Sequence, residues 1–469
     1  TSLHQKKGLY LLTRFEFTNR DLRKCKLFGH GRLDSQDTWI IHSKFIPKNT
    51  NIFNFCLGYP GCDQKLIYLF LICGYKLYND PYYIKSYHNH KSLERTYAGK
   101  ANMLVPKPYG LILPILPNKG KIFNALANTF IIQKNCTLEI IYKKYGDLKL
   151  LKNMRYDCND FLIEYIKKKI MDNKNFVIPR IAGVENNVAH LTHKINKKLD
   201  NMLYDSVDRI HNNFTKEQIK EIEYEIHFSG IKNNLSTMKN NAGIQIRSTY
   251  SLSKYSQDYF KAFKNCDLFL KWDDYGNVYP GIKNSHDYVT NKFKNKESIN
   301  ALVLDIFHYI HNPWTHALKG KRILIVSPFI ESIKTKEKIR KEIYGVDLFP
   351  DCTFVYIKPP QTQGKSESRE YNIELDEFIK KVEEIKDTFD VALCSCGGYG
   401  NIVVNKIYEM DKSAIYVGGV LQMYFGIYGM RWLRERKEVM QLYLNKHWSR
   451  PLELEKPQGF KEVEGSAYW

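Results

Sequence analysis

The stretch that decides the fold is "FDVALCSCGGYGNIVVNKIYEMDKSAIYVGG", at residues 389–419. An apolar run, a glycine cluster, a helix-like segment, a second apolar run and a glycine pair follow one another in it. Short apolar runs that alternate with helical patterns are typical of parallel strands joined by helices. The stretch therefore predicts two strands of a parallel sheet, each with a glycine turn at its carboxyl end.

The same alternation continues on the amino-terminal side of this stretch. The runs "KRILIVSPF" (321–329) and "CTFVYIKPP" (352–360) predict two more buried strands, and each is followed by a helical pattern. Farther back, "NFVIPRIAG" (175–183) predicts a strand that ends in a glycine turn, with a long helical stretch after it at about 187–225. We expect an α/β domain with a Rossmann-like, doubly wound parallel sheet.

The amino-terminal part of the chain has a different pattern. It mixes short strand-like runs with one apolar helix expected near 66–77, which predicts a smaller α+β domain. A proline-rich passage at 105–120 breaks any regular element and marks a boundary. We therefore expect two domains, at 1–120 and 121–469.

The composition limits the classes of partner. A formal charge of +21 over 469 residues indicates an anionic partner, which is a nucleic acid, a membrane surface or a phosphate-bearing substrate. The lysines are scattered and no nucleic-acid motif is present, which argues against nucleic acid. The longest apolar run near the amino terminus, at 66–73, is too short to span a membrane, and no signal peptide is visible. The ten cysteines lack zinc-site spacing, so we expect reduced thiols in a cytoplasmic protein.

The carboxyl ends of the predicted strands carry the candidate ligand-binding residues. In a doubly wound sheet, ligands bind at these ends, where glycines let backbone amides approach a phosphate. Glycines that only permit turns give the same pattern, so both interpretations stay open. No dinucleotide or ATP-hydrolysis motif is present. The candidates for donor binding at these ends are Ser327, Gly397, Gly398, Tyr399, Gly400, Gly418, Gly419, Gln422 and Arg431.

The segment "VIPRIAGVENN" (177–187) adds an arginine and a carboxylate to the candidate site. Arg180 can pair with a diphosphate, and Glu185 can bind a metal or orient a sugar hydroxyl. A solvated arginine and a helix-starting glutamate would give the same pattern. In the amino-terminal part, His88 and His90 alternate along a strand-like run and, with Asp37, form a candidate metal site. Surface histidines are the alternative.

These residues lie in segments that resemble a known enzyme family. From about 159 to 469, "FVIPRIAGVE", "FDVALCSCGGYG", "AIYVGGVLQMYFGIYGMRW" and the closing "GFKEVEGSAYW" resemble glycosyltransferases of the GT-D fold, encoded in polysaccharide and glycan gene clusters of bacteria and large viruses. The resemblance implies a nucleotide-sugar donor and an acidic DXE motif that holds a divalent metal. Arg180 and Glu185 match that pattern, but the motif's Asp falls on Gly183, which leaves manganese or magnesium dependence open. Gly183 is included among the donor-binding candidates.

The first hundred residues resemble the acceptor-side half of a GT-A glycosyltransferase. The resemblance is carried by "LLTRFEF", "DSQDTW" and "IKSYHNH". It implies a partial transferase domain whose nucleotide-binding half is missing or lies upstream. It also implies that Asp63 is a catalytic base or acceptor ligand, and that His88 or His90 is a metal ligand.

Together these expectations give a glycosyltransferase that moves a sugar from a nucleotide-sugar donor to a glycan acceptor in surface-glycan synthesis. The candidate catalytic carboxylates are Glu185, Glu331 and Asp63, since the acceptor hydroxyl needs a base. Tyr399, Trp432 and Trp448 are candidates for stacking on a base or sugar, with a core position as the alternative. The rival functions are a noncatalytic nucleotide-sugar or glycan-binding module, a nucleic-acid-binding protein, and a pyruvyl or methyl transferase.

Overall fold

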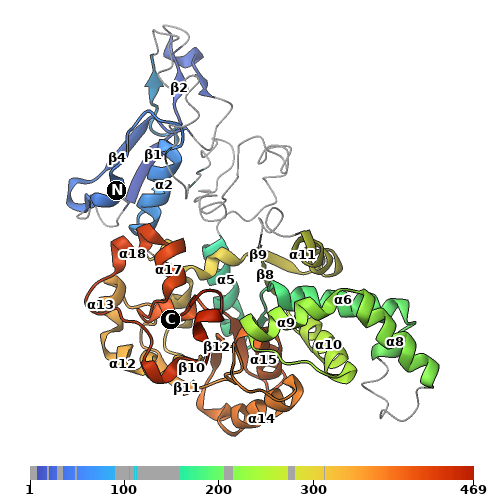
Figure 1. Ribbon diagram of the computed structural model, residues 1–469. Helices are drawn as coiled ribbons and strands as arrows, with labels where there is room; N and C mark the ends of the chain where they lie inside the picture. The colour runs from blue at the N-terminus through green and yellow to red at the C-terminus, as the bar shows by residue number, and fades with distance from the viewer. Residues whose placement is uncertain are drawn as a thin grey trace. The chain divides into compact units, whose positions relative to one another are not determined.

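The computed structural model describes most of the chain, in several ranges (Figure 1). These ranges are 8–17, 21–28, 35–47, 50–89, 158–204, 215–272, 280–310 and 312–469, with the single positions 105, 110 and 112. The boundary expected at residue 120 lies outside them. Among the described helices, none is both long and apolar enough to cross a membrane.

The chain forms two compact units. Unit 1 comprises Thr1–Tyr165, Asp305–His316 and Glu438–Tyr443. Unit 2 comprises Ile166–Leu304, Ala317–Lys437 and Leu444–Trp469. Helices α5 (Cys158–Met171) and α18 (Lys437–Tyr443) each contain a division between the units.

Unit 1 contains two small mixed sheets and a buried helix. In the first sheet, β1 (Gly8–Leu12) pairs antiparallel with β4 (Thr38–Ile41) and parallel with β5 (Lys76–Tyr78). In the second, β2 (Phe15–Glu16) lies between β3 (Lys26–Leu27) and β6 (Tyr87–His88). Helix α2 (Cys62–Ile72) is buried on most of its surface, as its apolar sequence predicts. It begins and ends about five residues before the expected helix, because Gly74 with φ +80° turns the chain into β5.

Unit 2 is built on a five-stranded parallel sheet, which confirms the α/β prediction. The strand order is β11 (Thr353–Ile357), β10 (Arg322–Val326), β12 (Val391–Cys394), β13 (Ser413–Tyr416) and β7 (Val177–Ile178). The chain leaves β10 for β11 on one side and later reaches β12 on the other, so the sheet is doubly wound. A parallel bridge between Arg180 and Leu270 joins β7 to a second pair, β8 (Leu268–Lys271) and β9 (Glu297–Asn300).

Helices flank the sheet of unit 2 (Figure 1). Those before β10 are α6 (Val184–Lys198), α8 (Lys216–Phe228), α9 (Ile231–Ala242), α10 (Thr249–Asn265) and α11 (Pro280–Lys292). Those after it are α12 (Ile330–Lys336), α13 (Arg340–Tyr344), α14 (Tyr371–Glu384), α15 (Gly400–Tyr408), α16 (Leu421–Tyr424) and α17 (Met430–Glu435). One hydrophobic core joins the strands to α6, α10, α14 and α15. The single long helix expected at 187–225 is instead α6 and α8, which are separate.

Candidate active site

Arg180 follows β7 directly and is fixed by its backbone. Its amide donates to Oδ1 of Asn401 at 3.0 Å, and Nδ2 of Asn401 donates back to its carbonyl at 2.8 Å. Asn401 is buried in the first turn of α15, which follows β12. A side-chain amide that satisfies both backbone groups of one residue acts like a strand partner. The turn after β7 is thereby held at the carboxyl edge of the sheet.

The guanidinium of Arg180 lies across the end of β13. Its centre is 4.7 Å from the ring of Tyr416 and 5.7 Å from the ring of Trp272, and Nη1 donates to the Val417 carbonyl at 3.4 Å. Gly418, with φ +76°, makes room for it, since a Cβ there would lie 2.4 Å from Nη2. A guanidinium that is stacked on aromatic faces can pair through its N–H groups with a planar or tetrahedral anion.

A second arginine lies beside the next glycine. A Cβ on Gly419 would lie 2.3 Å from the ring of Tyr468, so that ring covers the glycine. Arg431, in the first turn of α17, donates from Nη1 to the Tyr468 hydroxyl at 3.1 Å. The same nitrogen is 3.6 Å from a carboxylate oxygen of Glu464. The charge of Arg180 lowers the pKa of Tyr468, as does that of Arg431, although burial raises it overall. Tyr468 is therefore close to both arginines.

Glu185 supplies a carboxylate with a raised pKa. It stands in the first turn of α6, just after the N-cap Gly183. Burial raises the pKa of its carboxyl, and the charge of Glu464 raises it further, while Arg180 and the amides of Gly183 and Glu185 pull it down. The charge of Glu185 in turn raises the pKa of the buried Tyr259 hydroxyl. A carboxylate whose pKa is raised in this way is a better proton acceptor than an ordinary one.

These contacts define the candidate site, which lies at the carboxyl ends of β7 and β13. Its members are Arg180, Glu185, Trp272, Gly418, Gly419, Arg431, Glu464 and Tyr468. The arginines and glutamates are all partly exposed. The arrangement can bind an anion and remove a proton in the same place.

The glycine loop after β12 is packed against the protein itself. A Cβ would lie 2.7 Å from the Ala242 carbonyl at Gly397, 2.4 Å from Ile244 at Gly398, and 2.1 Å from the Tyr416 ring at Gly400. The carbonyls of Gly397 and Gly398 accept hydrogen bonds from buried tyrosine hydroxyls at 2.9 and 3.3 Å. Internal packing therefore accounts for these three glycines. The space where a Cβ would stand is filled by the protein itself and has no room for a phosphate.

Three aromatic residues, which were candidates either for stacking or for a core position, are buried. Tyr399, Trp432 and Trp448 are 1%, 4% and 7% exposed. The alternative, a core position, is confirmed for all three. Gln422 is buried as well, and its Nε2 donates to the carbonyls of Ile427 and Tyr468, so it positions the closing segment.

The first backbone amides of α12 could bind an anion, but they already bind the carboxylate of Glu455. The amides of Glu331 and Ser332 donate to Oε1 of Glu455 at 2.8 and 3.2 Å. Glu455 is only 2% exposed. Ser327 is fully buried, and its hydroxyl accepts from the Phe329 amide at 3.2 Å. A donor-binding role of Ser327 therefore does not fit this end of the sheet. The carboxylate of Glu331 pairs with Lys334 at 2.8 Å, and its catalytic role stays a prediction.

The metal site expected in unit 1 is not assembled from the described residues. Asp37 accepts from Nη1 of Arg14 at 2.9 Å, and Nδ1 of His88 is 3.4 Å from its other oxygen. His90 lies outside the described residues. Asp63, in the first turn of α2, accepts from the Gln36 amide at 3.4 Å. Across the described ranges, no three His, Cys, Asp or Glu side chains are grouped to hold a metal ion.

Four members of the environment of Arg180 were missed by the sequence analysis. They are Trp272, Asn401, Glu464 and Tyr468. The only signal for the last two was the closing segment of the resemblance. Residues 464–466 all have positive φ, of 47°, 63° and 63°, and this sharp bend directs Tyr468 back to the glycine pair. Two non-glycine residues in that conformation are not predictable from sequence.

Comparisons with known proteins do not assign the chain to a family. No family model and no curated protein matches the chain. One solved structure, described as "Selenomethionine substituted structure of domain of unknown function 1792 (DUF1792)", has 13% identity and a TM-score of 0.27. The match covers 64% of this chain and 92% of that one. A likeness of this size carries no argument about fold or function.

Proposed function

We propose that unit 2 is a glycosyltransferase domain that transfers a sugar from a nucleotide-sugar donor to a glycan acceptor. The observation that carries the proposal is the meeting of Arg180 and Arg431 around Tyr468, beside Glu185 with its raised pKa. Glycosyl transfer needs these two functions together: cationic groups for the leaving diphosphate and a base for the acceptor.

The arginines are assigned to the donor diphosphate. A guanidinium offers several N–H donors in a fixed plane and stays charged at all working pH values. Arg180 is held flat by Tyr416 and Trp272, and Arg431 is held by Tyr468 and Glu435, to which its Nε donates at 3.3 Å. Groups fixed before the substrate arrives stabilise developing charge without reorganisation.

Glu185 is assigned to the acceptor hydroxyl. In the proposed step, the acceptor oxygen forms a bond to the anomeric carbon and its proton passes to the carboxylate of Glu185. The bond between the anomeric carbon and the diphosphate oxygen breaks, and its electron pair leaves with the nucleoside diphosphate. Arg180 and Arg431 receive that charge. A second carboxylate candidate, Asp63, lies in unit 1, and its role as catalytic base or acceptor ligand stays a proposal.

The residues present do not fit the divalent metal of the GT-D pattern. Gly183 stands where a carboxylate would be needed, and Glu185 and Glu464 share their surroundings with two guanidinium groups. Mn²⁺ and Mg²⁺ favour several oxygen ligands, and nearby guanidinium charge opposes a cation. We therefore propose that the two arginines carry the charge of the leaving group, and no step is assigned to a metal.

The test is thermal unfolding with a panel of nucleoside diphosphates and UDP-, GDP- and dTDP-linked sugars, with Mn²⁺ or EDTA. Binding at about a hundred times Kd stabilises by roughly 2.7 kcal/mol, which is a visible shift in Tm. We expect one nucleotide class to raise Tm equally in Mn²⁺ and in EDTA. Transfer of labelled sugar then distinguishes an enzyme from the noncatalytic binding module, which would bind the donor without turnover. No shift with any donor would contradict the proposal.

A further inference from the structure

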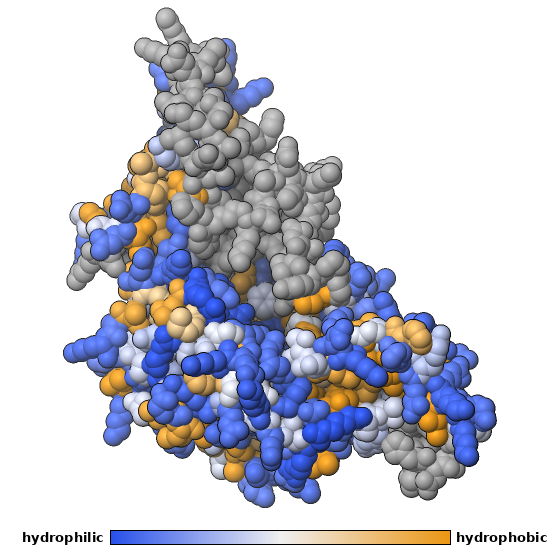
Figure 2. All heavy atoms as spheres, in the orientation of Figure 1, coloured by the Kyte–Doolittle hydropathy of each residue, from blue (hydrophilic) through white to orange (hydrophobic). Residues whose placement is uncertain are grey.

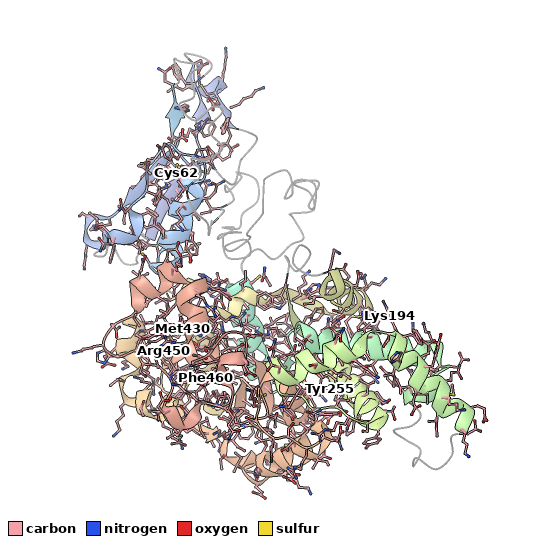
Figure 3. All side chains as sticks on the ribbon, in the orientation of Figure 1. Cys62, Lys194, Tyr255, Met430, Arg450 and Phe460 are labelled. Carbon is pink, nitrogen blue, oxygen red and sulfur yellow. The ribbon has the colours of Figure 1, made fainter. Side chains whose placement is uncertain are left out.

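A group of lysines and histidines lies on the side of α6 that packs against α11. We name it the α6–α11 cluster; its members are His190, His193, Lys194, Lys197 and Lys292. Lys194 is labelled on α6 in Figure 3. Hydrophilic side chains cover much of the visible face of unit 2, with small hydrophobic areas between them (Figure 2). The cluster begins at His190, about 7.5 Å along the helix axis from Glu185, since five residues of an α-helix rise by that amount.

The ammonium group of Lys292 is held in place by aromatic side chains. Its Nζ is 5.1 Å from the ring centre of Phe260 and 5.2 Å from that of Tyr288. It also donates to the Tyr288 hydroxyl at 2.8 Å. A lysine held against rings loses less side-chain freedom on binding than one that moves freely in solvent. This cation is therefore ready to meet an anion.

The two histidines form the base of the cluster. His190 stacks on Tyr288 with ring centres 4.3 Å apart, and the centre of the His193 ring is 5.3 Å from that of Tyr288. Burial and Lys194 lower the pKa of His190 to about 4, and burial and Lys292 do the same for His193. Both rings are neutral at pH 7, and each offers one N–H donor. The cluster itself therefore contains no negative group that offsets the charge of its three lysines.

Carboxylates of the neighbouring elements are engaged with other lysines. Their ion pairs are Glu225 with Lys198, Asp258 with Lys254, and Asp287 with Lys283. Within the described ranges, Lys194, Lys197 and Lys292 have no ion pair. Burial lowers the pKa of Lys292, and the like charge of Lys197 lowers it further. An anion bound between these two cations would offset their repulsion.

We propose that the α6–α11 cluster binds a phosphate group. Lys197 and Lys292 supply the charge. His193 stands one turn before Lys197 on α6, and its ring lies beside that of Tyr288, whose hydroxyl accepts from Lys292, so His193 supplies an N–H donor to the same ligand. The half-buried rings of Tyr204 and Tyr288 flank His193 and give a planar portion of the ligand a surface to lie on. The chemistry fits a phosphate carried by a small nucleotide or by a single-stranded oligonucleotide, since both combine phosphate with a flat base. The proposal is independent of the glycosyltransferase assignment.

The test uses [13Cε1]-histidine NMR, which reports on the cluster and not on the Arg180 site. Pyrophosphate is the first probe, and His193→Gln assigns the His193 signal. We expect pyrophosphate to shift that signal and to raise the pKa of His193 from about 4, since a nearby anion favours imidazolium. Lys197→Glu with Lys292→Glu should weaken binding by about tenfold or more. The charge-matched control is Lys283→Glu with Lys294→Glu, two exposed lysines from the same part of the chain.

The outcomes separate the sources of the phosphate. If AMP and a ten-nucleotide oligothymidylate bind equally per phosphate, the ligand is a small nucleotide. If the oligonucleotide binds much more tightly and with a steep salt dependence, the ligand is the phosphate backbone of a polynucleotide. Both results support a phosphate site. An unchanged His193 signal at millimolar pyrophosphate, or equal binding by the two double variants, would overturn it.

Discussion

The guanidinium of Arg180 lies over Gly418, in the space that a side chain there would fill: a Cβ would be 2.4 Å from Nη2. Gly418 also has φ +76°, a conformation that other residues adopt at a cost. Glycine is therefore favoured at position 418 for two separate reasons. One is the backbone conformation, and the other is the room that glycine leaves for the arginine. The two reasons can be separated by mutation.

Gly418→Ala should abolish donor binding with only a modest loss of stability. The methyl group would meet the flexible end of Arg180, which can move aside, so the main stability cost is the positive φ, about 1 kcal/mol. Gly320→Ala is the control, because Gly320 has φ +73° and nothing within 4 Å of its Cβ position. We expect equal losses in Tm and a loss of donor affinity in Gly418→Ala alone. Equal donor affinity in the two variants would contradict this.

Arg180→Lys should weaken donor binding about tenfold to a hundredfold while leaving the fold intact. Lysine keeps the charge but loses the planar fork that lies between Tyr416 and Trp272, and hydrogen bonds to a charged group are worth about 1.5 to 3 kcal/mol. Titration calorimetry with the nucleoside diphosphate measures the change. Arg369→Lys is the control, since Arg369 binds Glu374 and Glu377 at the surface. Wild-type affinity in Arg180→Lys would remove the guanidinium from the donor site.

Most of the sheet in unit 2 was predictable from sequence. The apolar runs within 321–329, 352–360 and 389–419 became strands β10 to β13. Strands β10, β12 and β13 are largely buried, as apolar runs predict, whereas the edge strand β11 is only half-buried. Their order was not predictable, because β7 joins β13 from about 235 residues away in the sequence. Arg180 and Gly418 meet only because of that pairing.

The candidate site was half predictable for the same reason. Arg180, Glu185, Gly418, Gly419 and Arg431 were expected, since they stand at strand ends or helix starts. The glycine loop at 397–400 has equally strong local features, but its neighbours are Ala242, Ile244 and Tyr416, which only tertiary packing brings there. Local pattern cannot distinguish a glycine that receives a ligand from one that receives another part of the protein.

Glu455→Gln should destabilise unit 2 by about 1 to 3 kcal/mol, because it removes a buried carboxylate that accepts from the first amides of α12. Glu453→Gln is the matched control in the same turn, since its side chain is 86% exposed and pairs only with Lys456. Chemical denaturation with urea measures both variants. Equal stability would show that the carboxylate of Glu455 does not cap α12.

Glu185→Gln should stabilise the protein at neutral pH and abolish sugar transfer. The pKa of Glu185 in the folded protein is above its ordinary 4.5, so between those two values the folded state holds a proton that the unfolded state has released. The wild type therefore loses stability as pH rises from about 4.5 through the raised pKa, whereas Gln has no proton to lose; each pKa unit corresponds to about 1.4 kcal/mol.

Tm measured at pH 4 and at pH 7 checks this prediction. The difference between Glu185→Gln and wild type should be small at pH 4 and favour the variant at pH 7. Glu435→Gln is the control, because its partly exposed carboxylate accepts from Arg431 and takes no part in the proposed proton transfer. Full transfer activity in Glu185→Gln would exclude Glu185 as the base, even if the stability difference followed the expected pH dependence.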